Sequence, residues 1–170
     1  MVERDHWWPV ALADDVGAAP VPVTLLDEPL VLWRDGAGAV QAFADRCPHR
    51  GARLSLGAVV EGQLRCPYHG WRFDGDGRCR AIPALPGFAP PDGHAACRHA
   101  LAQAHGLLWV CLGTPVAPAP PSLPPLPPRR VVHGPFDVAT SAPRAIENFL
   151  DTAHFAYVHE GWLGAPTHAE

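Results

Sequence analysis

Two short segments of the chain each combine a cysteine with a histidine. Cys47-Pro48-His49 is followed after sixteen residues by Cys66-Pro67-Tyr68-His69, which gives the spacings C-x-H and C-x-x-H. Each segment can offer one thiolate and one imidazole to a metal. Two chemistries fit this set: a [2Fe-2S] cluster with two cysteines on one iron and two histidines on the other, or a tetrahedral zinc site. Zinc modules usually pair like with like in each loop, so the mixed loops favour the cluster.

The residues around these ligands strengthen this interpretation. Gly51 and Gly70 lie just beyond the histidines, where backbone amides must approach the sulfur atoms closely. The strings R-C-P-H-R-G and C-P-Y-H-G-W-R-F-D-G-D-G resemble the Rieske domain of ring-hydroxylating oxygenases, over about residues 7–113. Respiratory Rieske proteins carry an extra disulfide-forming cysteine in each loop, where this chain has Ala52 and Tyr68. The resemblance is therefore to the oxygenase and ferredoxin types, and we expect a potential toward the lower part of the Rieske range.

A second group of polar side chains lies near the end of the chain. Asn148, Asp151 and His154 step by three, so they share one stripe of a predicted helix, and His159 follows five residues later. Five residues rotate a regular helix by about 140°, so both imidazoles reach one metal only if the helix is irregular between them. We predict such an irregularity near Ala156. Read alone, the segment could equally be an amphipathic helix with two incidental histidines.

This segment resembles the mononuclear-iron motif of the Rieske non-haem iron oxygenases. The resemblance implies that His154 and His159 bind Fe(II), and that Asp151 bridges the iron to a neighbouring subunit's Rieske histidine in a homotrimer. Asn148 matches a nearby position that is not a ligand. The family's third iron ligand is a distant carboxylate, and neither Glu160 nor the terminal Glu170 is a convincing substitute. We therefore expect a truncated α subunit that is inactive by itself.

The elements that must position these residues are mostly strands. From Val21 to Gly113, short apolar or alternating runs are separated by Gly, Asp and Pro, the pattern of antiparallel β structure without ordinary helices. We expect three hairpins with these strand pairs: 30–34 with 40–44, 71–73 with 78–82, and 101–104 with 107–112. The remaining cysteines, Cys79, Cys97 and Cys111, are expected to be buried on strands. Five other histidines show no ligand spacing: His94, His99, His105, His133 and His168.

Proline divides the chain. Eight of the fourteen residues from Pro115 to Pro128 are proline, which predicts an extended linker. The expected fold is thus mainly β: an antiparallel β-sandwich Rieske domain over 1–114, a linker over 115–130, and over 131–170 the short α/β start of an incomplete catalytic domain. That start comprises a strand over 131–138 and a helix from Thr140 or Ser141 to about Val158, with Pro143 in its first turn.

Composition limits the partners. The net charge is −4 and the basic residues are scattered, which disfavours nucleic acid; no apolar run is long enough to cross a membrane, so we expect a cytoplasmic protein. The resemblance implies an oxidoreductase that receives electrons from a reductase or ferredoxin. With O2 it would hydroxylate, dihydroxylate or O-demethylate an aromatic or other cyclic substrate, as in aromatic hydrocarbon catabolism. The alternative is a Rieske ferredoxin, a carrier that has no need for the helix over 146–159.

Overall fold

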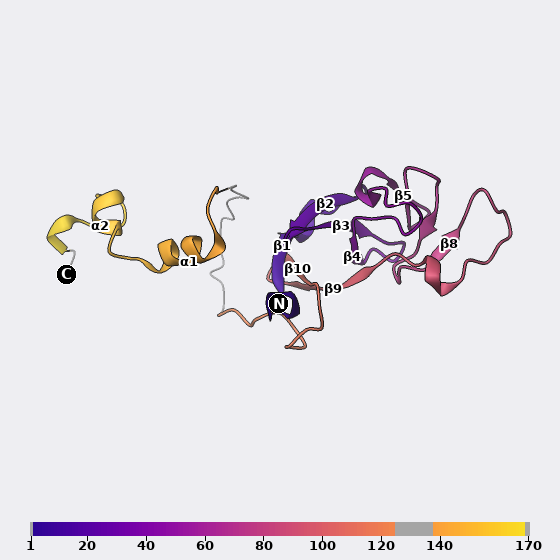
Figure 1. Cartoon of the computed structure of the whole chain (residues 1–170). Coiled ribbons are helices and arrows are strands. Elements are labelled where there is room, and N and C mark those ends of the chain that lie inside the picture. Colours follow the sequence, from indigo (N-terminus) through magenta and orange to yellow (C-terminus); the bar gives the residue numbers. More distant parts are fainter. Residues whose placement is uncertain (1, 125–137, 169–170) are drawn as a thin grey trace. The chain divides into compact units, whose positions relative to one another are not determined.

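The computed structural model describes residues 2–124 and 138–168 (Figure 1). The chain divides into two compact units, Met1–Pro125 and Leu126–Glu170. No helix within the described ranges is both long and apolar enough to span a lipid bilayer.

The first unit contains two antiparallel sheets. The larger has six strands in the order β1-β10-β9-β4-β3-β2, and the smaller has four in the order β5-β6-β7-β8. The strands of the larger sheet are β1 (Trp8–Leu12), β2 (Val21–Leu25), β3 (Glu28–Arg34), β4 (Val40–Ala44), β9 (Arg98–Ala104) and β10 (Leu107–Cys111). Those of the smaller sheet are β5 (Ala58–Val60), β6 (Gln63–Arg65), β7 (Arg72–Phe73) and β8 (Cys79–Ala81). The predicted, mainly β class is confirmed.

Strand β3 explains how the two sheets pack. Successive side chains of a strand point to opposite faces of the sheet, and the four central residues of β3 are all buried. Both faces of β3 are therefore covered. Leu30 and Leu32 belong to a hydrophobic cluster within the larger sheet. Val31 and Trp33 point the other way, into a second cluster that also contains residues of β6, β7 and β8. This second cluster joins the two sheets, and it is the one that holds Cys47 and Cys66.

All three predicted hairpins form. Strands β3 and β4, β7 and β8, and β9 and β10 pair antiparallel. The first two turns use the same device, an aspartate carboxylate that accepts two backbone N–H groups. Asp35 Oδ1 accepts from Ala37 and Ala39 at 2.9 and 3.0 Å, and Asp74 Oδ1 accepts from Asp76 and Arg78, both at 3.0 Å.

The third turn and the short helices complete the first unit. His105 and Gly106 both have positive φ, at 57° and 80°, as a two-residue hairpin turn requires. The helices here are single 3₁₀ turns: η1 (Val2–Asp5), η2 (Ala13–Asp15), η3 (Leu54–Leu56) and η4 (Asp92–His94). Cys79 and Cys111 are buried as expected, but Cys97 is exposed, because it precedes β9 and does not lie in it.

The start of the proline-rich segment packs on the first unit. Asp5 accepts the N–H of Thr114 on its carboxylate and that of Val116 on its carbonyl, and Trp7 Nε1 donates to the carbonyl of Ala117 at 2.9 Å. His105 Nε2 lies 3.3 Å from the carbonyl of Pro121. These contacts join the start of the predicted linker to the first unit. The rest of the predicted linker from 125, and the strand predicted at 131–138 apart from Val138, lie outside the described residues.

Within residues 138–168, the second unit has two α-helices where one was expected. Helix α1 (Ala142–Leu150) begins after Ser141 with Pro143 in its first turn, as predicted. It ends at Leu150, and α2 (Phe155–Val158) follows after four non-helical residues. The predicted irregularity near Ala156 is therefore misplaced: Ala156 lies inside α2, and the chain departs from the helix at Asp151–His154. The remaining element is η5 (Pro166–His168).

Candidate metal centre

The two cysteine loops adopt the same backbone turn. Cys47 follows β4 and Cys66 directly follows β6. In the first loop the Cys47 N–H donates to the Ala52 carbonyl at 2.8 Å, and the Gly51 N–H donates to the Cys47 carbonyl at 2.9 Å. In the second loop the corresponding bonds, Cys66 to Trp71 and Gly70 to Cys66, measure 2.8 and 3.2 Å.

The backbone favours glycine at the fifth position of each turn. Gly51 has φ of 73° and Gly70 has φ of 70°, a region that costs other residues energy. The histidines break the equivalence of the two loops. His49 occupies the third position of its turn and His69 the fourth, which is the structural meaning of the spacings C-x-H and C-x-x-H.

The two thiols lie together in the core. Cys47 and Cys66 are each 2% exposed. The pKa of the Cys47 thiol is raised to about 11. Burial raises this pKa most and the adjacent Cys66 thiol also raises it, while the backbone N–H groups of His49 and Arg50 lower it by donating to the sulfur. These amides are placed to stabilise a thiolate. Metal binding here would displace a thiol proton.

The two imidazoles lie together at the surface. The rings of His49 and His69 are 4.6 Å apart between centroids and inclined at 64°, and both residues are exposed. Loss of hydrating water lowers the pKa of His49, and His69, Arg50 and His94 lower it further by charge repulsion. A lowered pKa keeps the imidazole neutral, which is the form that binds metals.

The donor set fits a [2Fe-2S] cluster. Thiols pair with each other on the buried side, and imidazoles pair with each other on the exposed side. Two irons with different ligands suit this arrangement, because one takes the thiolates and the other the imidazoles. Within the part of the chain that the structure describes, no three His, Cys, Asp or Glu side chains are grouped so as to hold one metal ion.

A stack of aromatic rings beside His49 was not predicted. Trp71 lies parallel to His49, with ring centroids 4.7 Å apart and an interplanar angle of 4°. His94 stacks on Trp71 at 5.2 Å, and its buried Nδ1 has no hydrogen-bond partner among the described residues. From the sequence we predicted no special role for His94, because it lies twenty-three residues after Trp71 and shows no ligand spacing. No spacing rule could have detected its contact with Trp71.

In the second unit, the two predicted iron ligands flank α2. His154 precedes the helix and His159 follows it, and their ring centroids are 5.5 Å apart. Asp151 Oδ2 lies 3.5 Å from His154 Nδ1, close enough to orient that imidazole. The Asn148 side chain is exposed on α1 and has no hydrogen bond to the described residues. The structure thus brings His154, His159 and Asp151 together and leaves Asn148 apart.

A family model described as the Rieske [2Fe-2S] domain covers residues 6–92, a range that contains all four candidate cluster ligands.

Individual relatives match nearly the whole chain. Methylxanthine N1-demethylase NdmA of Pseudomonas putida is 37% identical over 182 residues, covering 98% of this chain and 50% of that protein. The dicamba O-demethylase oxygenase component of Stenotrophomonas maltophilia is 35% identical and covers 92% of this chain and 47% of that protein. The solved structure of Pseudomonas putida CBB5 NdmA superposes with a TM-score of 0.85 at 34% identity, covering 98% of this chain and 53% of that one. The chain thus spans about half the length of these relatives.

Proposed function

Because this chain belongs to the Rieske [2Fe-2S] domain family, in the branch of the Rieske non-haem iron oxygenase α subunits, we propose that it acts in the oxygenase component of such an enzyme. Members of that family include demethylases and dioxygenases. The chain would receive electrons from a reductase or ferredoxin, for use in hydroxylation or O-demethylation of an aromatic or other cyclic substrate.

The observation that carries the proposal is the pair of matched turns. They place Cys47 and Cys66 in the core and His49 and His69 at the surface, so that both pairs of ligands are arranged by the backbone. We assign these four residues as the cluster ligands. When bound, the cluster would supply one-electron transfer, and a mononuclear iron would supply O2 activation.

His154 and His159 are the proposed ligands of that mononuclear iron. Asp151 would hold the ring of His154 through Nδ1 and leave its other nitrogen for the metal. Its carboxylate is 53% exposed and could also be reached by a neighbouring subunit. In a homotrimer it would connect the two redox centres as a positioning residue, and Asn148 would lie beside the path.

The alternative of a ferredoxin-like carrier explains less of the chain. A carrier needs only the first unit, where all four proposed cluster ligands lie. The similarity to NdmA extends over 98% of the chain and therefore includes α1 and α2. This extent supports the oxygenase assignment.

The test is to reconstitute the chain anaerobically with iron and sulfide. We expect two acid-labile sulfides per chain and two irons in the cluster, besides any Fe(II) bound at His154 and His159, together with the electron paramagnetic resonance spectrum of a reduced Rieske centre. Purification with one zinc and no acid-labile sulfide would overturn the assignment. A Cys97→Ser variant provides the control, because this exposed cysteine lies outside both turns and its loss leaves the cluster unchanged.

A further inference from the structure

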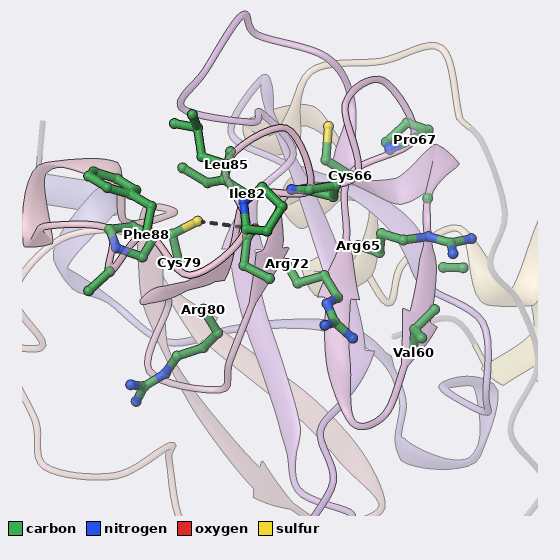
Figure 2. Close-up of a pocket in the computed structure, with 18 of the residues that line it drawn as sticks. Val60, Arg65, Cys66, Pro67, Arg72, Cys79, Arg80, Ile82, Leu85 and Phe88 are labelled. Atoms are coloured by element: carbon green, nitrogen blue, oxygen red, sulfur yellow. Dashed lines mark hydrogen bonds between the residues drawn. The ribbon is translucent and has the colours of Figure 1, made fainter.

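A surface groove of about 1110 Å³ borders the second cysteine loop (Figure 2). Its floor is formed by strands of the smaller sheet, and one wall is formed by the loop over residues 83–90, which follows β8. Cys66, Pro67 and Gly70 form another part of the lining. A molecule in this groove would therefore touch the backbone of the loop that supplies half of the proposed cluster ligands.

Three arginines come from neighbouring strands of the groove. Arg65 lies on β6, Arg72 on β7 and Arg80 on β8, and Figure 2 shows their side chains along one side of the groove. Arg65 and Arg72 are direct cross-strand partners. Two like charges at such positions destabilise a sheet, so the fold bears a cost for this arrangement.

The positive charge of the groove is only partly neutralised. Arg72 pairs with Glu61 at 2.7 Å, and Arg80 pairs with Asp74. Arg65 is exposed and has no ionic partner among the described residues. The described groove lining contains no Asp or Glu, although the chain as a whole carries a net charge of −4. The groove thus carries one unpaired positive charge, on Arg65, beside two arginines that are already paired.

The opposite wall is apolar and partly preorganised. Leu85 and Phe88 are 52% and 47% exposed. Backbone bonds from Leu85 N–H to the Ile82 carbonyl (2.9 Å) and from Phe88 N–H to the Leu85 carbonyl (3.1 Å) fold this wall into consecutive turns. Exposed apolar side chains rimmed by charges are typical of a protein interaction surface.

We propose that this groove is the docking surface for an acidic electron-donating protein. This inference rests on the proposed function, since it requires a cluster at Cys66. Carboxylates of the donor would meet Arg65 first, and its apolar contacts would meet Leu85 and Phe88. One electron passes from the reduced donor to the oxidised cluster, so the donor is oxidised, the cluster is reduced, and no bond forms or breaks. Electron-transfer partners usually form small, charge-steered interfaces, which a groove of this size suits.

The experiment measures cluster reduction by stopped-flow absorbance in the reconstituted full chain. The probe is a reduced acidic plant-type ferredoxin, whose potential of about −400 mV makes transfer to a Rieske centre favourable. We expect Arg65→Glu to lower the second-order rate constant by roughly fivefold at low salt and to weaken its dependence on ionic strength. Leu85→Ser is expected to slow the reaction less, without changing the salt dependence.

Arg78→Glu is the matched control. Arg78 is exposed, lies in the turn between β7 and β8, and does not line the groove, so it makes the same charge change outside the proposed surface. Equal effects of Arg65→Glu and Arg78→Glu would overturn the docking surface. The docking surface would also be overturned if the Arg65→Glu variant has a lower midpoint potential and this lower potential fully accounts for its slower reduction.

Two further measurements separate the possible failures. Photoreduced deazariboflavin is a small reductant that needs no docking surface, and we expect it to reduce all variants equally fast. If neither reductant reduces the chain, the proposed function fails; if only the docking result fails, the cluster assignment stands. Sedimentation tests a second copy as the occupant: salt-dependent self-association that Arg65→Glu abolishes would overturn the assignment to an electron donor.

Discussion

At the scale of single residues, the site separates the proposed cluster ligands by their exposure. The thiols are buried and the imidazoles reach the surface, although the sequence places each thiol only two or three positions from its imidazole. The residue types and spacing were enough to predict which four residues lie together. They could not predict the parallel stack of Trp71 on His49, because that contact depends on how one loop folds over the other.

Replacing His69 by cysteine tests the ligand assignment. A thiolate adds negative charge to the centre, so we expect a cluster to remain and its midpoint potential to fall by roughly 100 mV or more. Redox titration followed by electron paramagnetic resonance gives the value. His105→Asn is the control, because His105 lies in a distant turn with positive φ, which asparagine tolerates. An unchanged potential in His69→Cys would contradict the assignment.

A histidine outside the site makes stability depend on pH. His99 in β9 is buried, and burial lowers its pKa below the ordinary 6.5, with a smaller effect of Arg4 in the same direction and an opposing hydrogen bond to the Leu112 backbone. The folded state therefore resists protonation. The contribution of His99 to stability is complete above pH 6.5 and is lost as the pH falls through the lowered pKa.

Urea unfolding at several pH values between 5 and 8, followed by circular dichroism, tests this expectation. Each unit of pKa lowering corresponds to about 1.4 kcal/mol between the two limits. We expect His99→Gln to flatten the fall in unfolding free energy at low pH. His6→Gln is the control, and parallel curves for His99→Gln and the unchanged chain would show that His99 does not titrate on unfolding.

At the scale of elements, hairpins were predicted well and longer-range order was not. The aspartates and glycines of the three turns mark hairpins within a few residues, whereas the order β1-β10-β9-β4-β3-β2 joins strands almost a hundred residues apart. The helix predicted to reach Val158 ends at Leu150. The prediction was too long because side-chain periodicity does not reveal where the backbone leaves the helix. The two-helix arrangement nevertheless brings His154 and His159 within reach of each other.

The positive φ of the turn glycines predicts that adding a methyl group at Gly70 lowers the stability of the protein. In Gly70→Ala the new Cβ would lie 3.0 Å from Pro83 Cγ, at a φ of 70°. We expect a loss of about 1–2 kcal/mol in unfolding free energy and a lower cluster content after reconstitution. Gly17→Ala, whose Cβ meets nothing within 4 Å, is expected to leave both unchanged. Equal stability of the two variants would refute the preference for glycine.

The link between Asp151 and His154 can be tested on metal binding alone. We expect Asp151→Asn to weaken anaerobic Fe(II) binding by roughly tenfold, because the carboxylate orients the imidazole. The cluster spectrum stays the same, since its ligands lie in the other unit. Asn148→Ala is the control, because Asn148 lies one turn earlier, within α1, and has no hydrogen bond to His154 in the structure. Equal affinities for the two variants would remove the proposed role of Asp151.

At the scale of the whole molecule, the cluster belongs to one unit. Every proposed cluster ligand and its packing lies within Met1–Pro125. We expect a polypeptide of residues 1–125 to give the same cluster spectrum and potential as the whole chain. Ending it at residue 113 removes the contacts of Thr114, Val116 and Ala117 with the N-terminal segment, so thermal denaturation is expected at a lower temperature. A lost cluster in the 1–125 polypeptide would show that the second unit takes part in its binding.

The burial of Cys47 and Cys66 also affects how readily these cysteines are oxidised. Thiolate sulfur is the ligand atom that peroxide damages, in steps that become irreversible, and access decides which cysteine is attacked. Here the oxidation-prone ligands face the interior, and imidazoles, which withstand peroxide better, face the solvent. Exposed Cys97 meets an oxidant first. This orientation keeps the two thiol side chains away from an oxidant in the solvent.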